Sequence, residues 1–103
     1  HAFVDSSKLG TNIEAMVAIK LTKNTKDEVE DFKKSMFVLP EVVNIYHLAG
    51  QVDFMLYIAV RDKDHLRDFV MDHVTKGYVK SLETSLIYDF SQNPLFPIYL
   101  DHE

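Results

Sequence analysis

The chain has 103 residues with 47% hydrophobic residues, no cysteine, and a formal net charge of −5 at pH 7. This length suits one domain with one core, and the lack of cysteine excludes disulfides and thiolate metal sites and fits a cytoplasmic protein. The sequence shows neither the roughly 20 apolar residues of a membrane helix nor a secretory leader, and its acidic charge disfavours direct contact with DNA phosphates.

The first half of the chain reads as strand, helix and strand. Apolar residues alternate through Ile13–Leu21, which predicts a strand, and the opposite side of that strand is mostly apolar too. Thr25 and Glu28 form a capping-box pattern, so we expect a helix to begin there and to end before Pro40. Its predicted inner positions are Val29, Phe32, Met36 and Phe37.

A hairpin and a second helix follow. We predict strands over residues 42–48 and 53–60, joined by a turn at residues 49–52. Asp62 or Asp64 can cap a helix that runs to about Val74 and is ended by Gly77. The predicted inner stripe of this helix consists of Leu66, Phe69, Val70 and His73.

A long fourth strand is predicted over residues 79–90, and the prolines that follow make residues 91–103 a tail without regular structure. The order β-α-β-β-α-β is that of a ferredoxin-like α+β fold, with a four-stranded antiparallel sheet and both helices on one face. The first and third strands would be central, because both are apolar on two sides, whereas the second and fourth carry the polar residues of edge strands.

This topology leaves an apolar sheet face without helices. The uncovered side chains would be Met16, Ala18, Met55, Tyr57 and Ala59, or their counterparts on the opposite face. A large exposed apolar patch usually marks an association surface, so we predict a homodimer that forms through this face of the sheet. Apolar residues of the tail, from Leu95 to Leu100, could reach across to the partner.

Several segments, in this order and spacing, resemble the ligand-sensing domain of the Lrp/AsnC (feast/famine) transcriptional regulators. They are Ala2-Phe3-Val4-Asp5 with Lys8-Leu9-Gly10, Leu39-Pro40-Glu41-Val42, the G-x-x-D hairpin in Tyr46-His47-Leu48-Ala49-Gly50-Gln51-Val52-Asp53-Phe54, Tyr78-Val79, and Glu83-Thr84. The resemblance implies a hinge strand in residues 1–12, an effector-binding and oligomerisation domain in residues 13–90, and a tail in residues 91–103. The chain departs from the family pattern at Gln51, where an acidic or polar residue is common, and at Val52, where an aromatic one is frequent.

The same resemblance implies a regulator rather than an enzyme. Such domains dimerise, stack into larger assemblies (often octamers), and bind an amino acid between dimers, without a cofactor. DNA is then bound only through a helix-turn-helix domain, which this chain lacks. We expect the effector site at Gly50, Gln51, Val52 and Asp53, with Thr84 and Ser85 as lesser candidates. Turn amides would bind the effector carboxylate and Asp53 its ammonium.

Simpler explanations stand beside this site. Gly50 could merely supply a positive φ, and Asp53 could satisfy the hairpin backbone. His65, Asp68, Asp72 and His73 share one helix and raise a metal hypothesis, but carboxylates are also common on solvated helix faces, so we predict no metal site.

Two other functions remain open. A small dimeric α+β-barrel enzyme, similar to monooxygenases, would enclose a cavity lined by polar groups such as Tyr46 and His47, the latter otherwise expected to be a partly buried strand histidine. A stand-alone amino-acid-sensing domain would need no hinge strand.

Overall fold

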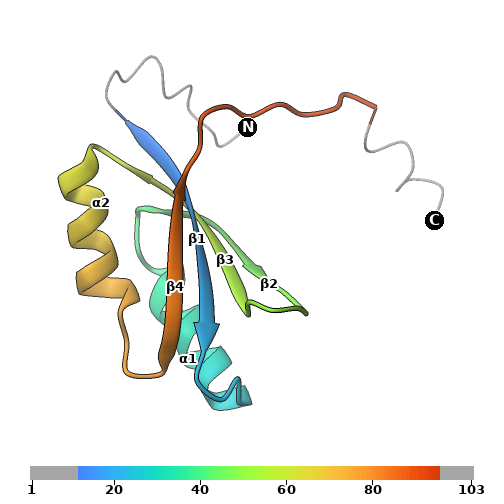
Figure 1. Ribbon diagram of the computed structural model, residues 1–103, viewed down its shortest axis with the longest axis vertical. Helices are drawn as coiled ribbons and strands as arrows, with labels where there is room; N and C mark the ends of the chain where they lie inside the picture. The colour runs from blue at the N-terminus through green and yellow to red at the C-terminus, as the bar shows by residue number, and fades with distance from the viewer. Residues whose placement is uncertain (1–11, 96–103) are drawn as a thin grey trace.

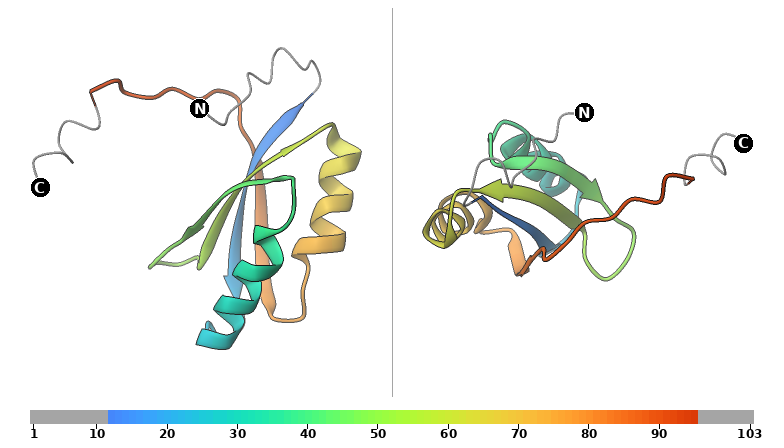
Figure 2. Two further views of the ribbon diagram at one scale, coloured as in Figure 1. Left: turned by 180° about the vertical axis from the view of Figure 1, so that it is seen from behind. Right: turned by 90° about the horizontal axis from the view of Figure 1, so that it is seen from above.

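The computed structural model describes residues 12–95, in which one antiparallel sheet carries two helices on the same face (Figures 1 and 2). Its four strands lie in the order β2-β3-β1-β4, so the first and third strands are central, as predicted. The elements in chain order are β1 (Ile13–Leu21), α1 (Lys26–Phe37), β2 (Val42–His47), β3 (Phe54–Val60), α2 (Lys63–Phe69) with the π-helical turn η2 (Val70–Val74), and β4 (Val79–Leu86). The expected α+β, ferredoxin-like fold is therefore confirmed.

Alternation along β1 and β3 builds the core beneath the helices. Every second residue of each strand is buried, and antiparallel pairing sets Val17 beside Leu56 and Ile19 beside Phe54. Phe32 of α1 packs on Phe54 with ring centroids 4.8 Å apart. Because these side chains all point to one face, the two helices are needed to exclude water from them.

Helix α1 begins as the capping box predicts. The Thr25 hydroxyl accepts the backbone N–H of Glu28 at 3.2 Å. The Glu28 carboxylate reaches further back than expected and accepts the backbone N–H groups of Lys23 and Asn24. At the other end of the helix the prediction for Phe37 was wrong, since this side chain is 82% exposed beyond the edge of the core.

Helix α2 begins at Asp62, whose carboxylate accepts the backbone N–H of His65 at 2.8 Å. The helix widens into η2, and Val74, which the predicted inner stripe lacked, is fully buried. The helical segment ends at Val74, as predicted, but Gly77 does not terminate it: the backbone N–H and hydroxyl of Thr75 both donate to the Val70 carbonyl and close the last turn.

Strand β4 is shorter than the predicted 79–90. Leu86 pairs with Ala15, and the backbone N–H of Ile87 donates to the Glu14 carbonyl at 2.9 Å. Because β1 begins at Ile13, further residues have no strand beside them, and residues 87–95 extend away from the sheet (Figure 1). The predicted hinge in residues 1–12 lies almost wholly outside the described residues, as do residues 96–103.

The sheet face opposite the helices is open within this chain, as Figure 2 shows. Its central side chains are partly exposed and belong to Met16, Ala18, Met55, Tyr57 and Ala59. These are the residues named from the sequence, and their face is the one without helices. We call this surface the open face.

Candidate functional site

The turn at residues 50–53 joins β2 to β3 and is anchored to the end of β1 by Asp53. The carboxylate Oδ2 of Asp53 accepts a hydrogen bond from the backbone N–H of Leu21 at 2.7 Å. The backbone N–H of Asp53 donates to the Ile19 carbonyl at 2.8 Å. The backbone carbonyl of Asp53 accepts a hydrogen bond from the backbone N–H of Leu48, and this bond closes the hairpin. Since Asp53 is only 6% exposed, its carboxylate serves the fold first and offers little surface to a ligand.

Gly50 is not required by the backbone of this chain. Its φ lies outside the left-handed region, so the expectation of a positive φ was wrong. A Cβ atom built on Gly50 would meet no heavy atom within 4 Å. Alanine would therefore fit here without strain, and within the described residues nothing explains why the position is bare.

Gln51 and Val52 complete the turn. Gln51 is exposed and its carbonyl accepts the Lys20 ammonium at 3.1 Å, while Val52 is half-buried. Lys20, which the sequence reading did not single out, thus sets a positive charge beside exposed backbone. The signal in the sequence was its position: Lys20 is the last residue of β1 whose side chain points to the face opposite the helices.

Thr84 does not join this turn within one chain. It pairs with Val17 on β4, at the opposite edge of the sheet from β2, and its side chain shares the helix-covered face. There it lines a surface hollow of about 400 Å³ between α2 and β4. Ser85, its neighbour, pairs with Met16 and belongs to the open face.

Tyr46 and His47 point to opposite faces of β2. Tyr46 pairs with Met55 on the open face, whereas His47 pairs with Phe54 and stacks on its ring at 4.7 Å. Both side chains are exposed, so the expectation of a partly buried His47 was wrong. They cannot line one cavity, as the enzyme alternative requires.

The open face carries a perturbed tyrosine. Burial, followed by the charge of Glu14 and a hydrogen bond with it, raises the pKa of Tyr57 above its usual value. Tyr57 is thus neutral at physiological pH, and its ring adds apolar area beside the carboxylate of Glu14.

Glu41 and His65 form a partly buried pair between the start of β2 and the start of α2. The atoms His65 Nε2 and Glu41 Oε2 are 3.0 Å apart, and His65 Nδ1 accepts the backbone N–H of Arg61 at 3.0 Å. Burial alone would raise the pKa of Glu41, but hydrogen bonds from His65 and from its own backbone, with the charges of His65 and His73, leave it lowered. The pair fastens α2 to the start of the β2–β3 hairpin.

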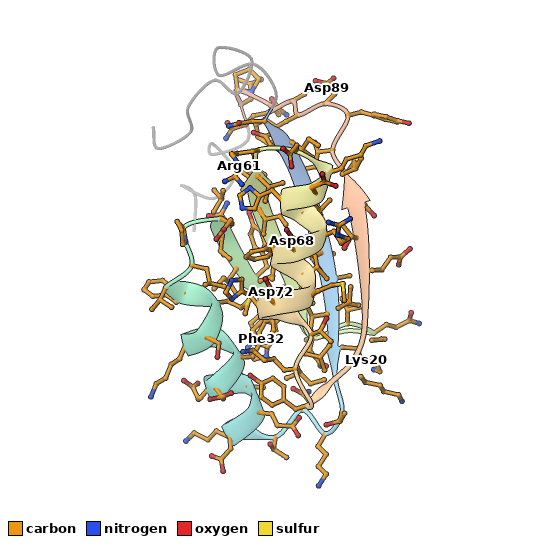
Figure 3. The ribbon with its side chains drawn as sticks, turned by 90° about the vertical axis from the view of Figure 1, so that its left-hand side faces the viewer. Lys20, Phe32, Arg61, Asp68, Asp72 and Asp89 are labelled. Carbon is orange, nitrogen blue, oxygen red and sulfur yellow. The ribbon has the colours of Figure 1, made fainter. Side chains whose placement is uncertain are left out.

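The metal hypothesis finds no support in residues 12–95, where no group of three or more histidine or acidic side chains could hold an ion. Asp68 and Asp72 are exposed on α2 and η2, the face turned to the viewer in Figure 3. None of the helices in these residues is long and apolar enough to cross a membrane.

The sequence from residue 14 to residue 91 matches the Lrp/AsnC ligand binding domain, and the chain belongs to this family. It is a family of transcriptional regulators and not of enzymes. The predicted resemblance is thereby confirmed, and the chain is a ligand-binding, regulatory domain of this class.

Particular relatives support the assignment. The chain is 32% identical over 87 residues to the HTH-type transcriptional regulator AldR of Mycolicibacterium smegmatis, a match that covers 84% of this chain and 51% of the relative. It thus spans about half the length of that regulator. A Neisseria meningitidis transcriptional regulator solved with L-methionine has a TM-score of 0.79 at 22% identity, covering 95% of this chain and 66% of that one. A Thermus thermophilus chain has a TM-score of 0.66 at 23% identity, with coverage of 79% and 99%.

Proposed function

We propose that this chain is the amino-acid-sensing and oligomerising part of a cytoplasmic Lrp/AsnC-type regulator, with its effector site at the 50–53 turn. The observation that carries the proposal is Gly50, a bare position that the isolated chain does not need. A glycine free of strain and contacts leaves room for the close approach of a ligand or a second chain. The similar N. meningitidis regulator was solved with L-methionine, which supports an amino acid as the ligand.

The turn offers suitable groups for an amino acid. Its exposed backbone and the nearby Lys20 ammonium, 3.1 Å from the Gln51 carbonyl, suit a carboxylate. Asp53 acts as a positioning residue that holds the turn against β1, and its negative charge favours a nearby ammonium. Because Thr84 lies at the opposite edge of the sheet, a site that includes both Thr84 and the turn would have to form between two chains.

We further propose that dimers form through the open face. The apolar side chains of β1 and β3 on that face are only partly covered within one chain, and a second sheet would bury them. Stacked dimers would then give assemblies up to octamers, with seams between dimers in which the effector binds. DNA would be contacted through a helix-turn-helix domain outside this chain, in keeping with the net charge of −5.

The first experiment compares melting temperature and light-scattering mass with and without each free amino acid. One amino acid should raise the melting temperature, and saturation at about 100 times Kd adds about 2.7 kcal/mol of stability. The variant Gly50→Ala should keep the unliganded melting temperature but lose this response. Gly77→Ala is a matched control, since a Cβ at Gly77 also meets nothing within 4 Å. If no amino acid changes either observable, or Gly50→Ala responds normally, the proposed site is wrong.

A second experiment tests the dimer surface. Met55→Lys places a charge at the centre of the open face and should convert the dimer into monomers. Val43→Lys, on an exposed position of the β2 edge, should leave the mass unchanged. A wild-type monomer at high concentration, or a dimer that tolerates Met55→Lys, would contradict the assignment of this face.

A stand-alone sensing domain is the second candidate. The T. thermophilus chain shows that this fold can make up almost an entire chain, since the match covers 99% of it. The length of the natural translation product distinguishes this candidate from the regulator.

A further inference from the structure

The segment that follows β4 exposes aromatic side chains. Tyr88 is fully exposed at 104%, and Phe90 is 68% exposed. Beyond the bond of Ile87 to Glu14, the backbone N–H of Phe90 donates to the Asp89 carboxylate, and the backbone N–H of Leu95 donates to the Asn93 side-chain oxygen. We call residues 87–95 the arm. Extended chains with large apolar side chains in water are typical of segments that pack on another surface.

A hollow of complementary character lies between α2 and β4. Its floor is apolar, and two cationic side chains stand on its rim. The apolar lining residues are Leu66, Val70, Met71 and Leu86, the hydroxyl of Thr84 lies beside them, and the cationic residues are Lys63 and Arg67. Met71 and Leu86 are 66% and 49% exposed, so the hollow holds apolar surface that its own chain does not cover.

The charges favour this hollow over the open face as the place where the arm binds. In the arm, the acidic residue Asp89 stands between two aromatic residues, Tyr88 and Phe90. Arg67 forms exposed ion pairs with Asp64 at 3.6 Å and with Asp68 at 3.4 Å, and exposed pairs of this kind are weak. Within residues 12–95, Lys63 takes part in no ion pair. The open face instead presents Glu14 and Glu83, which would repel Asp89, and Lys20 on that face already donates to the Gln51 carbonyl.

The arm does not reach the hollow of its own chain. Figures 1 and 2 show it leaving the sheet on the side away from α2. Nine residues span at most about 30 Å when fully extended, which is enough to cross an interface and follow the surface of a neighbouring protomer. We propose that the arm of one chain docks in the α2–β4 hollow of a second copy, with Tyr88 and Phe90 on the apolar floor and Asp89 near Lys63.

Because the chain has no cysteine, engineered cysteines can test this contact directly. Asp89→Cys protein is mixed with Lys63→Cys protein under mild oxidation, because the proposed contact brings these two positions together, and the heterodimeric disulfide is measured on a gel. The matched control is Asp89→Cys with Phe37→Cys, because Phe37 is 82% exposed and lies on α1, away from the hollow. Docking predicts at least about a tenfold faster cross-link with Lys63→Cys. Equal rates for the two mixtures, or no cross-link in either, would overturn the proposal.

A charge exchange provides a second readout. Asp89→Lys and Lys63→Glu should each weaken association, measured by light scattering, and the double variant should recover most of the loss. Lack of recovery would also overturn the proposal. The result is separable from the proposed function: Met55→Lys reports on the open face and amino-acid shifts report on the turn, whereas neither experiment involves Asp89.

Discussion

Replacing Asp53 with alanine is expected to destabilise the fold without any loss of apolar burial. The Asp53 carboxylate accepts the Leu21 N–H at 2.7 Å, and the two residues are only 6% and 2% exposed, so water cannot replace the acceptor. A buried donor left without a partner costs about 1–3 kcal/mol. At about 4–8 °C per kcal/mol for a domain of this size, the melting temperature should fall by about 4–24 °C.

Asp53→Asn separates the hydrogen bond from the charge. Asparagine keeps an oxygen acceptor in the same place, so its cost should be only about 0.5–1 kcal/mol. Urea unfolding followed by circular dichroism, at one fixed protein concentration, measures both variants. Asp68→Ala, on the exposed side of α2, is the control and should change stability by less than about 0.5 kcal/mol. If Asp53→Ala costs no more than Asp53→Asn or the control, the bond to Leu21 does not hold the turn.

Three further predictions test the core and the titrating groups. Phe32→Ala should cost about 3–5 kcal/mol because its ring is fully buried, whereas Phe37→Ala, at 82% exposure, should cost less than about 0.5 kcal/mol in the same urea assay. Burial, and then the hydrogen bond to a carboxylate, raises the pKa of Tyr78 to about 12, so the folded chain keeps a proton that the unfolded chain loses above about pH 10. The free energy of unfolding should therefore fall as the pH rises from about 10 to about 12, and it should fall less steeply in Tyr78→Phe. Because the pKa of Glu41 is lowered, its pairing stabilises the fold above the ordinary value of 4.5, and acid should remove this contribution in wild type but not in Glu41→Gln or His65→Ala.

Each of these results has a clear opposite. Equal costs at the two phenylalanines would contradict the assigned faces of α1. A pH profile of Tyr78→Phe that matches wild type would show that this tyrosine is not the group protected by the fold. Additive effects of Glu41→Gln and His65→Ala in a double-mutant cycle would show that the two side chains act separately.

Local patterns in the sequence predicted most of the fold. Alternation in Ile13–Leu21 and in the residues around Leu56 identified the central strands, because strand side chains alternate between faces. Thr25 marked the start of one helix, and Asp62 or Asp64 the start of the other, because a cap bonds to an amide only three residues away; the structure selects Asp62. The order of elements then fixed which strands are central, since right-handed crossovers leave few alternatives.

The candidate site was predicted less completely. The sequence named the turn residues, but it could not show that the Asp53 carboxylate bonds to Leu21, 32 residues earlier in the chain. It also could not show that Gly50 is free of strain, or that Thr84 lies at the other edge of the sheet. These facts depend on which strands meet and in what register.

The sequence by itself therefore determined the elements, their order and the apolar character of both faces of β1 and β3, because each of these depends on neighbours within a few residues. Only the tertiary structure decided where β4 ends, that Phe37 points outward and that Thr84 lies at the opposite edge of the sheet from the 50–53 turn. The physical reason is that hydrogen bonds between strands and the packing of helices on a sheet join residues distant in the chain, and their geometry is set when the whole sheet assembles.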